Sequence, residues 1–484
     1  MENGKMKNIP IISSITKFFK EFHKRFVNGS IGTKISHFIL GAGNFCHKQY
    51  VKGAVYLLLQ IAFIFFMFSG QVVINNTHFG LNALIKLKTL GTDAGGELIF
   101  DSNGVVIGFT EAENSMLILL FGVITIGIIL IYLFLWLSAI KSSYKADMDV
   151  LDGKKPTTIV EDLKSLFDER FHLLMLTPTC LAALIFTVLP TIYMILIAFT
   201  NYDRFHIPPS QLFTWTRFDN FAAIFTGSNE ISERFLPVLG WTFTWALVAT
   251  VTNYFGGILL ALLINKKEIK LKKLWRTVFI MTIALPQFVS LLAVKNLLNG
   301  MGPINSMLMD LNIISEPIAF LGAKAGQSIA SSADVTRARI TILVINLWIG
   351  VPYTMLQTSG ILMNIPSDLY EAATIDGANK NQMFFNITLP YIFFVTTPYL
   401  ISSFVGNINS FNVIFLLTGG GPKVGLFEAG GTDLLVTWLY KLTIEQYDYN
   451  LGAVIGIFTF IITSTITLIT YRRSKAYNEE DTFQ

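Results

Sequence analysis

Charged residues are scarce in this chain. Asp, Glu, Lys and Arg make up 14% of its 484 residues, whereas a soluble chain usually has about a quarter. Hydrophobic residues make up 52%, and the mean hydropathy is +0.55. A single water-facing globule has too little polar surface to cover so much apolar material. The net charge of +4 is also too small for a nucleic-acid-binding surface. The composition predicts a membrane protein.

Cysteine and clustered histidine are scarce as well. The chain has only Cys46 and Cys180, far apart, which excludes a disulfide framework and zinc spacing. No nucleophile–base pair stands out. We therefore expect no metal site, no catalytic residue and no enzyme activity. The six histidines, which show no metal-ligand spacing, are His23, His37, His47, His78, His172 and His206.

Long apolar stretches dominate what is present. A helix needs about 20 apolar residues to cross a bilayer. Eight stretches qualify, so we expect an all-α polytopic membrane protein with about eight transmembrane helices, two N-terminal and six in a core. The stretches are 53–73, 116–138, 173–199, 238–264, 277–298, 339–363, 390–416 and 449–471.

The basic residues indicate an orientation. Of the 36 Lys and Arg residues, 25 fall in the N-terminal segment, every second loop and the C-terminal tail, and 9 fall in the opposite loops. The other two, Lys295 and Arg339, lie near span ends. Cytoplasmic loops carry the excess of positive charge. This predicts a multi-pass protein with both termini in the cytoplasm.

The composition divides the chain further. We predict a cytoplasmic N-terminal segment at 1–52, two spans with an extracellular loop at 53–138, a polar cytoplasmic linker at 139–172 with a short helix at 159–171, a six-helix core at 173–471 and a cytoplasmic tail at 472–484. Segment 12–27 predicts a basic amphipathic helix on the anionic inner leaflet. Packing of this helix on a partner protein is the alternative. The apolar side of the predicted helix has Ile12, Ile15, Phe18, Phe19, Phe22 and Phe26, and its basic side has Lys17, Lys20, Lys24 and Arg25.

The spans contain no Asp or Glu well inside the membrane. A proton-coupled carrier usually keeps ionisable groups there, so this absence argues against one, although sodium sites built from backbone carbonyls escape the test. The chain also has no G-x-x-x-x-G-K-[ST] phosphate loop. Any ATPase that drives transport would be a separate subunit.

Neutral polar residues occur inside two spans. Ser403, Asn407 and Ser410 follow i, i+4, i+7 spacing, which places them on one helical stripe beside Asn409 and Asn412. Amides and hydroxyls suit a hydroxyl-rich ligand such as a sugar, because they bind it without burying charge. Hydrogen bonding between helices is the alternative.

The sixth span has NLWIGVPYTMLQTSG, in which Pro352 can kink the helix and Gly350 allows close approach. Tyr353 supplies a ring that can stack on a sugar. An ordinary kinked packing helix is the alternative.

The loop 364–390, NIPSDLYEAATIDGANKNQMFFNITLP, predicts a helix–turn–helix elbow. Pro366 and Ser367 indicate a helix start, and Gly377 breaks the helix where a left-handed turn is needed. A second helical stretch follows, and Pro390 opens the seventh span. We name the segment 364–390 the elbow. Its small residues favour docking into a groove of another protein.

The elbow resembles the EAA loop of ABC importer permeases. The matching residues are Glu371-Ala372-Ala373, Asp376-Gly377-Ala378, and then Ile387, Leu389 and Pro390. The resemblance implies that the elbow docks into a cleft of an ATP-hydrolysing subunit and transmits its closure to the membrane helices. The ATPase-coupling residues would be Glu371, Ala372, Ala373, Asp376, Gly377, Ala378 and Pro390.

From about residue 160 onward the chain is similar to MalF-type permeases of carbohydrate importers, through ITLP, SSFVGNINSFNVIFLLTGGGP and GGTDLLVTWLY. The resemblance implies a bacterial cell-membrane subunit that passes an oligosaccharide, foremost maltose or maltodextrin. It implies a MalG-like second permease, two MalK-like ATP-binding subunits with ATP and Mg, an extracellular sugar-binding protein, contact with membrane lipid, and no cofactor on this chain. The implied substrate-binding residues are Ile349, Gly350, Tyr353, Ser403, Gly406, Asn407 and Ser410.

Two features depart from the family pattern. The best-known maltose permease has an aromatic residue where Gly406 stands and an amide where Ser410 stands, so one stacking platform is missing. The loop at 200–237 is short, whereas the enteric relative has a large periplasmic domain there. A permease for another glycan or for glycerol phosphate, an ion-coupled secondary carrier and a membrane enzyme are the alternatives. A site for glycerol phosphate would need basic residues facing the pathway, and none is visible in spans six and seven.

Overall fold

The computed structural model describes residues 10–69, 79–92, 98–100, 106–109, 113–208, 210–226, 230–266, 268–324, 326–425 and 429–473. The chain forms two compact units, 1–215 and 216–484. The described residues include seven helices long and apolar enough to cross a membrane, and one further pair of helices bent at a short break. The predicted all-α polytopic fold, with about eight spans, is therefore confirmed.

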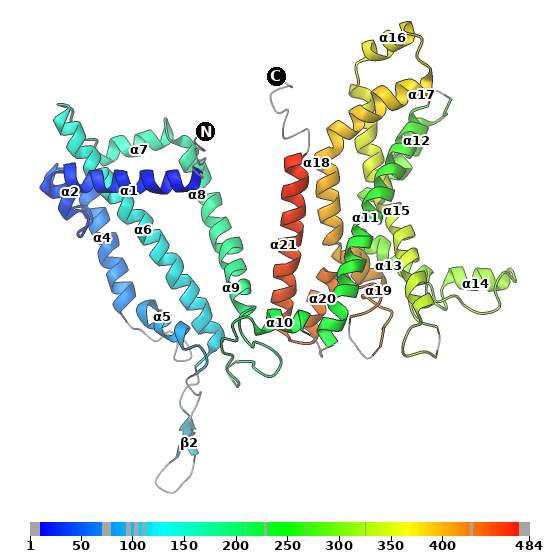
Figure 1. Ribbon diagram of the computed structural model, residues 1–484, viewed down its shortest axis with the longest axis horizontal. Helices are drawn as coiled ribbons and strands as arrows, with labels where there is room; N and C mark the ends of the chain where they lie inside the picture. Colours follow the sequence, from blue (N-terminus) through cyan, green and yellow to red (C-terminus); the bar gives the residue numbers. More distant parts are fainter. Residues whose placement is uncertain are drawn as a thin grey trace, which may run out of the picture. The chain divides into compact units, whose positions relative to one another are not determined.

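The first unit contains the first three spans (Figure 1). The elements of this unit are α1 (Pro10–Asn28), α2 (Ile31–Ile35), α3 (Ala42–Cys46), α4 (Tyr50–Phe68), α5 (Gly80–Lys88), β1 (Leu98–Phe100), β2 (Val106–Phe109), α6 (Ser115–Leu151), α7 (Ile159–Phe167), α8 (Phe171–Ala183) and α9 (Leu189–Ile197). A π-helical turn at Leu184–Val188 joins α8 to α9.

Three details of this unit differ from the expected pattern. The strands β1 and β2 pair antiparallel, so the described part of the loop between the first two spans contains a small hairpin. The second span continues as α6 to Leu151, well into the predicted linker. The predicted linker helix is α7, which a Thr158–Glu161 capping box starts and which ends at Phe167 rather than 171.

The predicted amphipathic helix is α1. The rings of Phe22 and Phe26 meet His37 edge-on, at centroid distances of 5.3 and 5.1 Å, whereas Phe19 is 63% exposed. The side chains of Ile12 and Ile15 lie outside the described residues. Docking of the exposed side on the inner leaflet stays a prediction.

The second unit contains the other spans and the elbow. A π-helical turn at Phe384–Thr388 joins α17 to α18, and another at Lys441–Glu445 follows α20. The helices are α10 (Asp219–Phe225), α11 (Glu230–Asn265), α12 (Lys272–Ala284), α13 (Gln287–Leu297), α14 (Pro303–Asp310), α15 (Ser332–Asn364), α16 (Ser367–Ile375), α17 (Lys380–Met383), α18 (Leu389–Ile408), α19 (Phe411–Thr418), α20 (Leu435–Tyr440) and α21 (Tyr449–Arg473).

The predicted span 277–298 is not one helix. It divides into α12 and α13, whose axes meet at 94°. Leu285 adopts an extended conformation with ψ 136°, and Pro286 precedes α13. A residue before proline is driven out of the α region by the proline ring, so the helix ends there. The expectation of a continuous fifth span was wrong.

The seventh span also differs from its predicted form. Helix begins at Lys380 and runs through the π-helical turn into α18, so Pro390 lies inside a continuous helical segment and does not open it. The π-helical turn immediately before Pro390 accommodates its missing N–H group. At the other end α18 stops at Ile408, and α19 starts at Phe411.

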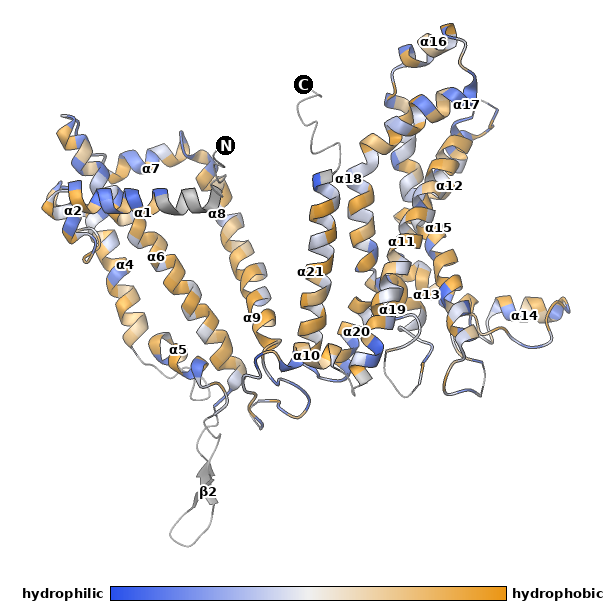
Figure 2. Ribbon diagram, viewed as in Figure 1, coloured by the Kyte–Doolittle hydropathy of each residue, from blue (hydrophilic) through white to orange (hydrophobic). Residues whose placement is uncertain are grey.

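Close helix contact builds the centre of the second unit. A Cβ added at Gly257 would lie 2.4 Å from Cβ of Thr354, so α11 and α15 touch through their backbones. Tyr254, Ile258 and Met355, which neighbour these two residues along α11 and α15, are buried. A further buried cluster of the same unit contains Trp245, Leu291, Ile342 and Ile414. Large apolar side chains are exposed on the spans, for example Phe134 on α6, Ile192 on α9 and Phe460 on α21. Figure 2 colours these three helices as largely hydrophobic. Such faces suit lipid rather than water.

Candidate functional site

The elbow connects α15 to α18 (Figure 1). Its first helix, α16, begins after Pro366, as predicted, and buries none of its residues. Apolar side chains are exposed there: Ile375 is 86% exposed and Leu369 is 46% exposed. A helix whose apolar side chains are open in the isolated chain presents a surface that another subunit can cover.

A left-handed turn shapes the elbow. Gly377 has φ +78° and follows Asp376, the residue that caps the C-terminal end of α16. The N–H of Ala378 donates to the carbonyl of Ala373 at 2.9 Å, which closes the turn. Asn379 then caps α17 reciprocally with Gln382. The predicted helix–turn–helix geometry is thus present, with Glu371 and Ala372 exposed on α16.

One hydrogen bond ties the elbow to the membrane helix. Tyr370 Oη of α16 lies 2.8 Å from Thr388 Oγ1, in the π-helical turn before α18. Thr388 is buried. The contact joins α16, next to Glu371, to the turn from which α18 starts.

A cavity of about 440 Å³ lies at the break between α12 and α13. Two predicted sugar residues, Ile349 and Tyr353, line it from α15. Gln287 and Ser290 line it from α13. The side chain of Tyr353 is 46% exposed, and its ring lies 5.8 Å from that of Tyr399 on α18. Hydroxyl, amide and aromatic groups in one cavity can bind a neutral sugar.

The predicted polar stripe on α18 is only partly formed. Ser403 and Asn407 lie on α18, and a Cβ added at Gly406 would meet nothing within 4 Å. Ser410 lies beyond the end of α18 and precedes α19, so the expected i+7 position on the same stripe was wrong. Helical spacing applies only while the helix continues.

Two of the predicted residues also serve packing. The amide of Asn407 donates to Thr250 Oγ1 on α11 at 2.9 Å. A Cβ added at Gly350 would lie 2.2 Å from Nδ2 of Asn253. Interhelical contact, the alternative to sugar binding, therefore contributes at both positions. No pattern in the sequence pointed to Gln287 and Ser290, although Pro286 marks the break beside them.

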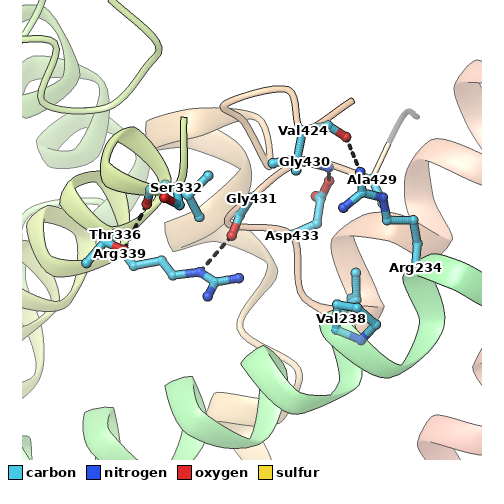
Figure 3. Close-up of a pocket in the computed structure, with 12 residues that line it drawn as sticks. Arg234, Val238, Ser332, Thr336, Arg339, Val424, Ala429, Gly430, Gly431 and Asp433 are labelled. Carbon is cyan, nitrogen blue, oxygen red and sulfur yellow. Dashed lines mark hydrogen bonds between the residues drawn. The ribbon is translucent and has the colours of Figure 1, made fainter. Parts of the chain in front are cut away.

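Sequence reasoning also missed a second cavity, of about 250 Å³, lined by Arg234, Arg339 and the segment before α20. Figure 3 shows Arg339 donating to the carbonyl of Gly431, at 2.8 Å. Its guanidinium also lies over the ring of Trp241, at 4.2 Å. Asp433 accepts from the N–H of Gly430 at 2.7 Å. These contacts fix the connection between α19 and α20 against α11 and α15.

Residues 253–477 match the family model described as "Binding-protein-dependent transport system inner membrane component". The galactooligosaccharide permease GanP of Bacillus subtilis is 32% identical over 91% of this chain and 97% of its own. The chain belongs to the permeases of binding-protein-dependent ABC importers. The maltodextrin permease MalC of Streptococcus pneumoniae is 32% identical over 92% of this chain and 95% of its own.

The MalF-type resemblance of this permease is confirmed. MalF of Escherichia coli is 35% identical over 54% of this chain and 49% of its own. A bacterial alginate ABC transporter, solved with a periplasmic protein that holds an alginate pentasaccharide, shares the fold at 24% identity, with a TM-score of 0.50 over 65% of this chain and 98% of that chain. The permease is thus a multi-pass membrane component of a transport system.

Proposed function

We propose that this permease passes an oligosaccharide through the membrane as one of the two membrane subunits of an ATP-driven importer. Maltodextrin is the foremost candidate substrate. The chain performs no covalent chemistry in this scheme and binds no cofactor of its own. Both termini lie in the bacterial cytoplasm in this scheme, and the excess of Lys and Arg in alternate loops supports that orientation.

The elbow is the observation that carries the proposal. It combines a helix with exposed apolar side chains, a left-handed turn at Gly377 and a hydrogen bond between Tyr370 and Thr388 at the start of α18. Two MalK-like subunits bind ATP and Mg, and their closure moves the elbow. Glu371, Ala372, Ala373, Asp376, Ala378 and Pro390 belong to the same coupling segment.

The sugar path follows from the cavity at the broken fifth span. An extracellular binding protein delivers the oligosaccharide to this chain and to a MalG-like partner. The sugar then contacts Tyr353 and Ile349 on α15, and Asn407 with Ser403 on α18. Gly350, Gly406 and Ser410 are the other candidate contacts. At Gly406 the space is open, which admits a branched or differently linked sugar.

A galacto-oligosaccharide is the second candidate substrate, because a permease that carries galactooligosaccharides in its name matches this chain at the same 32% identity as the maltodextrin permease MalC. The two substrates differ in the linkage and stereochemistry of their rings. The neutral polar groups at Gln287, Ser290 and Asn407 suit either sugar.

The test is sugar-stimulated ATP hydrolysis by the complete importer in proteoliposomes, with its binding protein added. We expect maltotriose to stimulate ATP hydrolysis, and an uncharged polyol of similar size to leave ATP hydrolysis at its basal rate. Stimulation by a galactotriose alone would replace maltodextrin with the second candidate. Uptake by this chain alone, sensitive to ionophores and indifferent to ATP depletion, would overturn the importer mechanism.

A further inference from the structure

A cavity of about 410 Å³ lies in the first unit, whereas the elbow and the proposed sugar contacts belong to the second. Its walls come from α4, α6, α7 and the start of α8. On α6, Ser138, Ser142 and Lys145 lie on one side of the helix and all line the cavity. Four cationic side chains but only two carboxylates surround it.

One cation and one carboxylate in this cavity neutralise each other. Lys52 is only 8% exposed and pairs with Asp162 of α7. Its ammonium also donates to the carbonyl of Thr157 at 2.7 Å. The pair fixes the wall of the cavity and adds no net charge to it.

The remaining charges leave the cavity positive. Lys141 and Lys145, one turn apart on α6, and Arg170 beside α8 are exposed and make no ion pair within the described part of the chain. Asp149 is the only other carboxylate in the wall. Three cations against one anion favour an anionic ligand.

The cavity also offers neutral donors. Ser142 Oγ accepts a hydrogen bond from the amide of Asn44 at 3.0 Å, so its own hydroxyl proton is free to be donated. Ser138 and the phenol of Tyr56 face the same space. Hydroxyls combined with ammonium and guanidinium groups are the donors that a phosphate oxygen accepts from.

The position of the cavity indicates which kind of molecule would present the phosphate group to it. The apolar run of α6 ends at Ile140, directly before Lys141, and Leu173 lies at the start of the third span. Tyr56 lies in the first turns of the first span. The cavity therefore lies where three spans enter the membrane at the same end, which is the level of lipid headgroups.

We propose that this cavity binds the phosphate group of an anionic phospholipid headgroup, held by Lys141, Lys145 and Arg170. The inference rests on the membrane placement of the first unit and is independent of the transported sugar. Free inorganic phosphate has the same binding chemistry, but it lacks the acyl chains that the neighbouring apolar spans would contact.

The test uses the full-length permease, purified in detergent with the subunits that copurify with it. Fluorescent phosphatidylglycerol is titrated against it in mixed micelles, beside fluorescent phosphatidylcholine. We expect phosphatidylglycerol to bind roughly tenfold more tightly, which is about 1.4 kcal/mol. Lys141→Gln/Lys145→Gln should remove that preference, because it removes two of the charged donors to the phosphate. Binding should weaken as salt is raised.

Two matched variants separate a site from diffuse charge. Lys141→Arg/Lys145→Arg keeps both charges and should keep the preference. Lys154→Gln/Lys155→Gln removes the same charge from the exposed linker between α6 and α7, outside the cavity lining, and should also keep it. An equal loss in the linker variant, no loss in the cavity variant, or displacement of the lipid by equimolar inorganic phosphate would overturn the proposal. Thermal unfolding of each variant checks that it is folded.

Discussion

The amide nitrogen of Asn407 on α18 donates a hydrogen bond to Thr250 Oγ1 on α11, across 2.9 Å. This contact uses one side of the Asn407 amide and orients it. A sugar hydroxyl can then donate to its carbonyl oxygen or accept from the second amide hydrogen. Packing and sugar binding are therefore compatible at this residue, and the contact predicts how they separate by mutation.

Asn407→Ala should raise the KM for sugar in the complete importer more than Thr250→Val does. Loss of Asn407 removes both the orienting contact and the sugar contact, whereas Thr250→Val removes only the former. Hydrogen bonds between membrane helices contribute about 0.6 kcal/mol on average, so the Thr250 variant should change KM by roughly threefold or less. Equal effects of the two variants would assign Asn407 to packing alone.

Gly377→Ala should reduce sugar-stimulated ATP hydrolysis without preventing assembly. Gly377 has φ +78°, a left-handed conformation that costs an L-residue with a Cβ roughly 1–2 kcal/mol. A Cβ there meets nothing within 4 Å, so strain and not collision is tested. Gly360→Ala, also in open space but inside α15, is the matched control. Full stimulation in the Gly377 variant would contradict the coupling role of this turn.

Tyr370→Phe should weaken coupling in a different way. It removes the hydroxyl that lies 2.8 Å from Thr388 Oγ1, a contribution of about 0.5–1.5 kcal/mol. We expect basal ATP hydrolysis to persist while transport per ATP falls. Tyr440→Phe removes a hydroxyl that makes no hydrogen bond within the described residues and is the control. The ratio of sugar transported to ATP hydrolysed measures the effect, and an unchanged ratio would assign the contact to structure only.

Gly350→Ala should destabilise the permease, whereas Gly406→Ala should not. The new Cβ at Gly350 would lie 2.2 Å from Asn253 Nδ2, whereas Gly406 has open space around it. Overpacking of this kind typically costs about 1–3 kcal/mol. Thermal unfolding in detergent compares the two. Equal melting temperatures would show that α11 and α15 separate easily at Gly350.

The amino-acid pattern predicted the number of spans better than their interruptions. Hydropathy finds the long apolar runs because a bilayer demands them. It does not register where a helix breaks inside such a run, as at Leu285–Pro286. The proline was visible in the sequence, but a proline in a membrane helix produces a kink or a full break according to what packs around it. The cavity beside Gln287 depends on that choice.

The shape of the elbow was predicted more accurately than the polar stripe on α18. The turn at Gly377 is local, so one glycine among small residues determines it. The stripe at Ser403, Asn407 and Ser410 required the helix to continue, and it ends at Ile408. Asn407 contacts Thr250, and Gly350 contacts Asn253, and both of these contacted residues lie on another helix, α11. No spacing within one helix reveals contacts to another.

A buried ion pair next to α20 yields a pH prediction. Asp433 is 1% exposed and accepts from the ammonium of Lys441 at 2.7 Å. Burial raises the pKa of Asp433 above its ordinary value, although Lys441, the N–H of Gly430 and the hydroxyl of Thr437 oppose the rise. Lys441→Met removes the opposing charge, so the pKa of Asp433 should rise further in this variant.

The sign of the effect follows from the raised pKa. A carboxyl whose pKa is higher in the folded than in the unfolded state favours folding when protonated, so that stability is present at low pH and is lost as pH rises through the folded pKa. Breaking a buried pair costs about 3–5 kcal/mol. Lys441→Met should therefore unfold at a lower temperature than the parent at pH 8, with the deficit shrinking at pH 5. Lys441→Met/Asp433→Asn, which has no buried charge, should show no such pH dependence. A deficit in Lys441→Met that is equal at both pH values would mean that Asp433 stays ionised without its partner.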